Sequence, residues 1–171
     1  MPTRDQIATA ITLARSEYIV NGESPSYFKI NDGLCDCFAA DVAKSFGGET
    51  DQFYAVGNGN FSKDGDDFSG DWDWALLKTH WGIKPPSGLT KKQVSDIQFG
   101  AHIWLTDGGF HYDAECPAGV EDFFELPIFQ RYIVQELRER GIPCDDVITD
   151  DIVEHPGCPV PNPVAAQMRQ R

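Results

Sequence analysis

The sequence predicts an α+β protein, because helical periodicity and strand-like alternation occupy different parts of the chain. Apolar residues recur at helical spacing in residues 4–20, 33–46 and 128–140. Residues 101–115 instead alternate between apolar and polar side chains on both sides of an Asp-Gly pair, as a β-hairpin does. We therefore expect N-terminal helices, one of which carries two cysteines, to pack on a small antiparallel sheet.

The first predicted helix covers residues 4–20, and Thr3 with Gln6 matches the capping box that begins a helix. Its apolar face is formed by Ile7, Ile11, Ala14 and Tyr18. Asn21-Gly22 ends this helix, and residues 23–32 are predicted to form a loop that leads to the next helix.

The second predicted helix, residues 33–46, contains the cysteine pair. Its buried face is formed by Phe38, Ala39, Val42 and Phe46. Cys35 lies on this face in the first turn, whereas Cys37 lies about 200° around the helix and points outward. Unpaired N–H groups and the helix dipole favour the thiolate form of a cysteine in a first turn. Cys35 is therefore a candidate nucleophile, and a structural buried thiol is the alternative.

In the middle of the chain, hydrophobic periodicity and helix start signals predict a short strand at residues 52–56, an acidic loop at 57–70, and helices at 71–80 and 90–97. Residues 63–67 are faintly similar to a calcium-binding loop. They lack the ordered acidic spacing and the closing glutamate of an EF-hand, so we expect a solvated loop.

The hairpin places a histidine and an aspartate on one face. If Asp107-Gly108 form a two-residue turn, Thr106 pairs with Gly109, and His102 lies directly opposite Asp113. A three-residue turn through Gly109 would shift the register by one residue and send Asp113 to the other face. The type of turn therefore decides whether these two side chains meet.

Beyond the hairpin, an aromatic cluster at residues 123–129 leads into the helix predicted at 128–140. We expect one domain over residues 1–155. Residues 156–171 contain four prolines and end in polar residues, which indicates a tail with little regular structure.

The composition narrows the classes of function. A formal net charge of −13 disfavours binding to nucleic acid or to an anionic membrane surface. No stretch is long and apolar enough to span a membrane, and the N-terminus lacks a signal-peptide pattern, so we expect a cytoplasmic protein. The five cysteines are odd in number, which argues against a disulfide framework, and Cys-x-Cys spacing is not that of a structural zinc site. We predict no cofactor and no metal, and leave the oligomeric state open.

A thiol, an imidazole and a carboxylate together make a catalytic triad, in which the imidazole takes the thiol proton and the carboxylate orients the ring. Cys35, His102 and Asp113 supply these groups. They meet if the cysteine helix packs on the His102 face of the sheet. The oxyanion donors would then be the backbone N–H of Cys35 and one donor from residues 27–32.

Four further residues are secondary candidates. Trp104 shares the His102 face and is expected in the core, where it would shield the imidazole from water. His111 shares that face as a substitute base or a surface residue. Glu115 replaces Asp113 if the register slips by two residues, and Cys37 is a possible accessory thiol. A metal cluster of His111, Asp113 and Glu115 is the alternative use of that strand face.

The segment from Gly33 to Ala39 resembles the cysteine motif of the transglutaminase-like enzymes, part of the wider papain-like group. His102-Ile103-Trp104 followed by Asp113 resembles the histidine and aspartate strands of that family. The resemblance implies a papain-like core with Cys35 as nucleophile, His102 as base and Asp113 as the orienting acid. Cys37 departs from the motif, which has an acidic residue there. The run 112–115 also resembles small bacteriophage proteins with this fold.

These observations predict a cysteine-dependent amide hydrolase or acyltransferase that forms a thioester with a peptide or protein substrate. The substrate amide lies in a peptide, an isopeptide or a glutamine side chain. The alternative is a non-catalytic acidic protein that keeps the fold and binds a basic or nucleic-acid-binding partner.

Overall fold

The computed structural model describes residues 2–47, 53–57, 60–62 and 72–142. In chain order its elements are α1 (Arg4–Val20), α2 (Tyr27–Asn31), α3 (Cys35–Lys44), β1 (Phe53–Gly57), β2 (Asn60–Ser62), α4 (Trp74–Trp81), α5 (Lys91–Asp96), β3 (His102–Asp107), β4 (Phe110–Tyr112), the 3-10 helix η2 (Phe123–Glu125) and α6 (Pro127–Glu139). The solvated loop predicted at 63–67 and the tail predicted at 156–171 lie outside the described residues.

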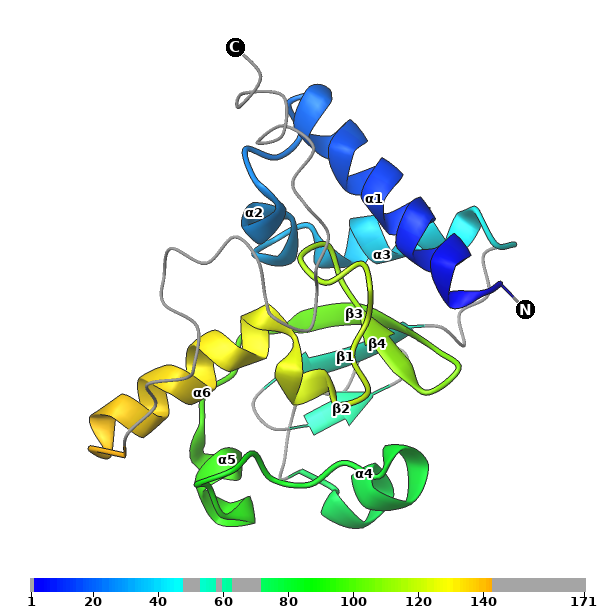
Figure 1. Ribbon diagram of the computed structural model, residues 1–171. Helices are drawn as coiled ribbons and strands as arrows, with labels where there is room; N and C mark the ends of the chain where they lie inside the picture. The colour runs from blue at the N-terminus through cyan, green and yellow to red at the C-terminus, as the bar shows by residue number, and fades with distance from the viewer. Residues whose placement is uncertain (1, 48–52, 58–59, 63–71, 143–171) are drawn as a thin grey trace.

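The strands form one antiparallel sheet in the order β2-β1-β3-β4. Figure 1 shows α1, α2 and α3 on one side of this sheet and α4, α5 and α6 on the other. The predicted α+β class with a small antiparallel sheet is therefore confirmed. Within the described residues, no helix combines the length and the apolar character that crossing a membrane requires.

Alternating residues of β3 and β4 pack into two separate hydrophobic cores, one on each face of the sheet. Leu105, Tyr112 and Ala114 pack with the apolar faces of α1 and α3. Trp104 points to the other side, where it packs with η2, α6 and the segments around α4 and α5. This is the consequence of strand geometry, in which neighbouring side chains point to opposite faces.

The helix start signals were largely correct. Thr3 and Thr90 each accept a hydrogen bond from the backbone N–H three residues on, with a reciprocal glutamine, so both predicted capping boxes are present. The loop predicted at residues 23–32 is wrong in part, because it contains the short helix α2. Ser26 caps that helix by accepting from the N–H of Lys29. The strand β2 likewise lies in a region predicted as loop.

The hairpin has the predicted type of turn at a different position. Asp107 pairs with Phe110, so the two turn residues are Gly108 and Gly109, with φ of 58° and 83°. A type I′ turn needs positive φ at both positions, which two glycines adopt at less cost than an aspartate followed by a glycine. The register therefore differs by two residues from the predicted one, and Asp113 stays on the His102 face.

The sequence argues against a disulfide framework, and in the structure one of the described cysteines, Cys116, is disulfide-bonded. The other two cysteines of the described residues, Cys35 and Cys37, are free. Disulfides persist mainly in oxidising compartments, and this disulfide therefore does not support the predicted cytoplasmic location. The location stays a prediction.

Candidate active site

The three predicted catalytic residues lie at the ends of secondary-structure elements. Cys35 is the first residue of α3, and His102 is the first residue of β3. Asp113 directly follows the last residue of β4. Leu34, the N-cap of α3, has no side chain that caps the helix, so the N–H groups of the first turn have no side-chain acceptor from the cap.

The aspartate and the histidine form a buried pair. Nε2 of His102 lies 3.3 Å from Oδ2 of Asp113, and each side chain is 1% exposed. The other oxygen of Asp113 accepts the N–H groups of Glu115 at 2.9 Å and Cys116 at 2.8 Å. One carboxylate oxygen thus anchors the turn that follows β4, and the second faces the imidazole.

The strand register places Asp113 diagonally to His102 rather than directly opposite it. Glu115 is the residue that the observed register would pair with His102, as expected for a slip of two residues. It does not take the place of Asp113, because β4 ends at Tyr112 and the chain turns away. The side chain of Glu115 binds Arg131 instead.

The ring of His102 lies close enough to the thiol of Cys35 to lower the pKa of that thiol. Nδ1 of His102 is buried and has no hydrogen-bond partner of normal geometry among the described residues, so it is the ring nitrogen left for the thiol once Nε2 faces Asp113. The apolar face of α3 packs on the Ile103 and Leu105 side of the sheet, opposite to what we expected. The two groups still meet because Cys35 lies at the very start of its helix and His102 at the start of its strand.

The electrostatics favour a thiolate beside an imidazolium. Burial raises the pKa of Cys35, but hydrogen bonding and charge from His102 and the N–H of Ile103 outweigh it, so the pKa lies below that of an ordinary thiol. Burial lowers the pKa of His102, but Asp113 and Cys35 outweigh it and raise the pKa to about 9. Burial raises the pKa of Asp113, and its bond to His102 brings it below the usual value.

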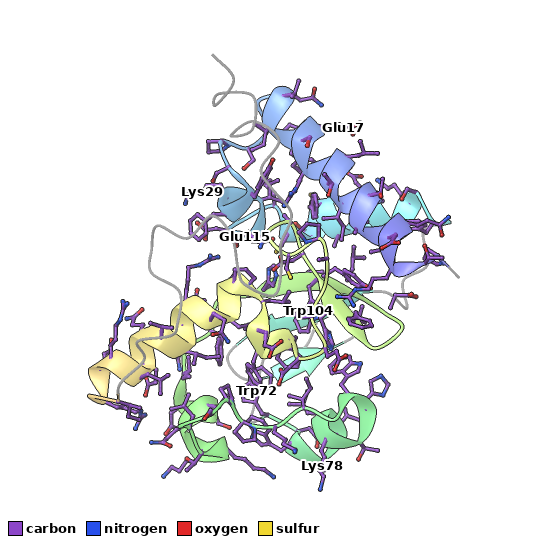
Figure 2. All side chains as sticks on the ribbon, viewed as in Figure 1. Glu17, Lys29, Trp72, Lys78, Trp104 and Glu115 are labelled. Carbon is purple, nitrogen blue, oxygen red and sulfur yellow. The ribbon has the colours of Figure 1, made fainter. Side chains whose placement is uncertain are left out.

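Aromatic rings enclose the imidazole. The ring of Trp104 is stacked against that of His102 at 6.1 Å between centroids, and the ring of Phe129 meets it edge-on at 5.9 Å. Trp104 is fully buried, as expected for a core residue that shields the imidazole, and it packs in the same core as residues of α6. Figure 2 marks it over the sheet, near the middle of the molecule. Exclusion of water strengthens the interactions of the histidine with its charged neighbours.

His111 is neither a surface residue nor suited to replace His102. It is fully buried, and its Nδ1 accepts a hydrogen bond from Nε1 of Trp104 at 3.0 Å. Burial, with a smaller contribution from the charge of His80, lowers the pKa of His111 to about 3. A ring that resists protonation in this way serves as an acceptor for Trp104 rather than as a base.

Cys37 is exposed, as its position on the helix predicted. The negative charge of Asp36 raises the pKa of this thiol, so it stays protonated at neutral pH. Cys37 therefore supplies a matched internal control for the reactivity of Cys35.

The side chains proposed for a metal cluster have separate partners. His111 binds Trp104, Asp113 binds His102, and Glu115 binds Arg131. In the described part of the chain, no three His, Cys, Asp or Glu side chains are arranged to hold a metal ion.

Three residues near the site were missed in the sequence. Arg15 is buried, its Nη1 donates to the carbonyl of Ala114 at 3.1 Å, and its guanidinium lies over the ring of Tyr27. The available signal was a charged residue four positions after Ile11 on the apolar face of α1. Asn31 and Arg131 gave no comparable signal, because their partners are distant in the sequence.

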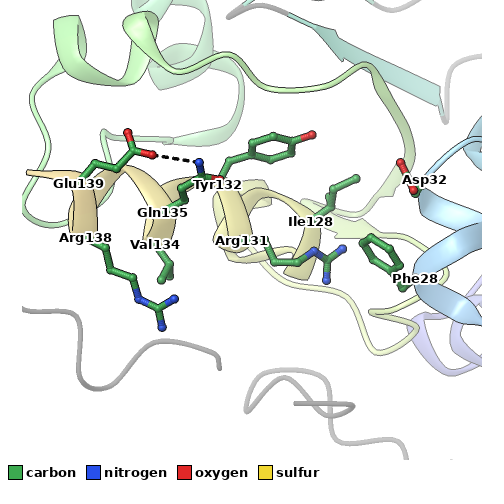
Figure 3. A pocket seen from close by; sticks show the side chains of 9 residues that line it. All are labelled: Phe28, Asp32, Ile128, Arg131, Tyr132, Val134, Gln135, Arg138 and Glu139. Carbon is green, nitrogen blue, oxygen red and sulfur yellow. Dashed lines mark hydrogen bonds between the residues drawn. The ribbon is translucent and has the colours of Figure 1, made fainter. Parts of the chain in front are cut away.

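A groove of about 470 Å³ runs between α2 and α6 (Figure 3). Its lining residues are Phe28, Asp32, Ile128, Arg131, Tyr132, Val134, Gln135, Arg138 and Glu139. One end adjoins the site in sequence, because Asp32 precedes Cys35 by three residues and Ile128 precedes Phe129, which contacts His102. The far end lies along α6 at Arg138 and Glu139.

Comparison of the chain with family models, with curated proteins and with solved structures finds no match.

Proposed function

We propose that this protein is a cysteine-dependent amide hydrolase or acyltransferase with a transglutaminase-like, papain-like core. The observation that supports it most is the buried His102, bonded to Asp113 through one ring nitrogen and interacting with the thiol of Cys35. A structural thiol has no need of a lowered pKa, of a buried imidazole partner or of an uncapped helix start.

In the proposed reaction the Cys35 thiolate attacks the carbonyl carbon of an amide, and the oxyanion accepts from the N–H of Cys35 at the start of α3. The imidazolium of His102 then gives its proton to the leaving nitrogen as the C–N bond breaks, which leaves a thioester on Cys35. Water or an amine next attacks the thioester, and His102 takes its proton. Loss of the acyl group regenerates the thiolate and the imidazolium, and Asp113 holds the ring throughout.

We infer that the substrate is a peptide or protein segment bound in the groove between α2 and α6. The stretch of α6 from Ile128 to Arg138 is about 15 Å long at 1.5 Å per residue. An extended peptide rises about 3.3 Å per residue, so this length accommodates about four residues. Aromatic and aliphatic side chains line the groove together with charged ones, as is common for peptide sites.

Labelling with iodoacetamide near neutral pH, followed by mass mapping, tests the proposal. We expect rapid modification of Cys35, slow modification of Cys37, and loss of the difference in His102→Ala. Slow, equal labelling of both thiols in the wild type, under conditions where the protein is folded, would contradict the proposed mechanism. A library of peptide and glutamine substrates then separates hydrolysis, acyl transfer and deamidation by the product released.

The large net charge of −13 favours one other function, a non-catalytic protein that binds a basic or nucleic-acid-binding partner. It predicts that Cys35→Ser keeps the biological effect, whereas reversing charges in residues 64–73 or 145–154 removes it. Unchanged binding after charge reversal would rule this alternative out.

A further inference from the structure

We propose that Asn31, Glu115 and Arg131 form a positioning cluster that sets the spacing between the Cys35 thiol and the His102–Asp113 pair. This inference rests on the proposed function, since it assigns a role to residues that hold the proposed catalytic groups. Glu115 and Arg131 act through the main chain of their own elements, and Asn31 also lowers the pKa of Asp113 through a side-chain hydrogen bond.

Glu115 lies at the centre of the cluster. Its Oε1 accepts from Nη1 of Arg131 at 3.0 Å, and its Oε2 accepts from Nη2 of Arg131 at 2.6 Å and from Nδ2 of Asn31 at 2.9 Å. The two-bond contact with a guanidinium fixes the direction of the carboxylate as well as its distance. The side chain of Glu115 is 16% exposed and that of Arg131 29%, so solvent screens the pair only partly.

The cluster holds the turn that carries the proposed acid. The N–H of Glu115 donates to Oδ1 of Asp113, and the N–H of Ala114 donates to Oδ1 of Asn31 at 3.3 Å. The carbonyl of Ala114 accepts from Arg15 on its other side. The main chain between Asp113 and Glu115 is therefore held at successive peptide groups, which fixes the direction of the Asp113 carboxylate toward His102.

The cluster also holds the segment that carries the nucleophile. Asn31 is the last residue of α2 and is 1% exposed. The neighbouring residue, Ile30, accepts the N–H of Leu34 through its carbonyl at 3.0 Å, and Cys35 follows directly. A shift of Asn31 away from Glu115 would thus move the start of α3 relative to Asp113.

Through Arg131 the cluster is also connected to the residues that pack on His102, the proposed base. Arg131 lies on α6, two residues after Phe129, whose ring contacts His102. The guanidinium of Arg131 also lies 4.5 Å from the ring centroid of Phe28 on α2. One carboxylate therefore links α2, the turn after β4 and α6, and Figure 2 shows Glu115 between these elements.

The test substitutes Glu115→Gln and follows the rate of Cys35 alkylation by iodoacetamide as a function of pH. We expect the neutral-pH rate to fall about ten- to a hundredfold and the profile to move to higher pH, because a displaced imidazole stabilises the thiolate less. Glu136→Gln is the matched control. It makes the same change at a carboxylate of α6 that is paired with an arginine, Arg140, outside the groove and the candidate site.

Arg131→Lys and Arg131→Met give the second measurement. Lysine keeps the charge without the two-bond geometry, so we expect it to retain more of the Cys35 reactivity than methionine does. Circular dichroism establishes that each variant is folded, and the Arg131 pair serves if Glu115→Gln is not folded. A folded Glu115→Gln or Arg131→Met protein with the wild-type pH profile would overturn the positioning role and leave the proposed function intact. Unselective labelling of the wild type would overturn both.

Discussion

The two nitrogens of the His102 ring have different tasks, and this division decides what the residue can do. Nε2 faces Asp113, whereas Nδ1 is left for Cys35. A carboxylate on one nitrogen fixes which tautomer the neutral ring adopts and stabilises the ring when it is protonated. The roles of all three side chains therefore depend on the position of the Asp113 carboxylate.

Asp113→Asn should remove this control without changing the size of the side chain. We expect the pKa of His102 to fall from about 9 toward the ordinary value and the pKa of Cys35 to rise. The rate of Cys35 alkylation at neutral pH should drop by about a hundredfold or more. NMR titration of the His102 ring measures the first change and alkylation the second, and an unchanged ring pKa would contradict the assignment.

The pH dependence of the proposed hydrolysis follows from the same pair. Activity should appear as Cys35 ionises, at a pH below that of an ordinary thiol, and should decline as His102 loses its proton through a pH of about 9.

The pKa of His102 is raised by folding, so its contribution to stability is complete below its unfolded pKa and is lost as the pH rises through about 9. Urea denaturation at several pH values measures this loss of folding stability. We expect His102→Gln to remove the loss of stability near pH 9.

At the scale of elements, glycines with positive φ determine how the hairpin and its following turn are built. Gly109 has φ of 83°, and a Cβ there would meet no atom within 4 Å. Gly119 has φ of 71°, and a Cβ there would lie 2.4 Å from Cε1 of the buried Tyr112. The two positions thus separate backbone strain from steric conflict.

Gly109→Ala should lower the free energy of unfolding by about 1–2 kcal/mol, the cost of a left-handed residue with a side chain. Gly119→Ala should cost at least about 2 kcal/mol and more than Gly109→Ala, because the ring of Tyr112 must also move within the core. Chemical denaturation of both variants measures these losses. Equal losses would mean that the core near Tyr112 relaxes freely.

Elements with local signals were predictable, and those fixed by distant contacts were not. The capping residues and apolar faces gave α1, α3, α5 and α6 close to their observed bounds. The five-residue α2 has too few residues for a periodic pattern, and its position depends on packing against α1 and α3. The register of the hairpin was wrong by two residues because the turn chemistry of Gly108 and Gly109 outweighed the Asp-Gly pair.

The candidate site, too, could be predicted only where its residues carry a local sequence signal. Helix-start chemistry and face alternation were enough to select Cys35, His102 and Asp113. They did not reveal that α3 packs on the Ile103 face, nor that Asn31 and Arg131 meet at Glu115. Those contacts join segments far apart in sequence, and no local pattern specifies them.

At the scale of the whole molecule, the sheet separates two layers, and the proposed site lies where both reach the start of β3. The layer with α1 and α3 brings Cys35, and the layer with α6 brings Phe129 against His102. The groove between α2 and α6 also has one wall from each layer.

Phe28→Ala tests whether this groove binds the substrate. Phe28 is 39% exposed, and removing its ring should raise KM for a peptide substrate by about fivefold through lost apolar contact. Alkylation of Cys35 by the small reagent iodoacetamide should change far less than in Glu115→Gln, because the bonds of Glu115 to Arg131 and Asn31 remain. Leu13→Ala, at a more exposed position on α1, is the control that should leave KM unchanged. A KM that responds equally to both substitutions would place substrate binding elsewhere.

Cys35 precedes its partners His102 and Asp113 by many residues in the sequence, and this separation has a consequence for folding. The thiol acquires its depressed pKa only after β3 and the turn beyond β4 have formed and docked, since its charged neighbour comes from residues that are synthesised much later. An unfolded or partly assembled chain therefore exposes an ordinary, slow-reacting cysteine. Rapid alkylation at this one position would count the native molecules in a sample and report the final step of their assembly.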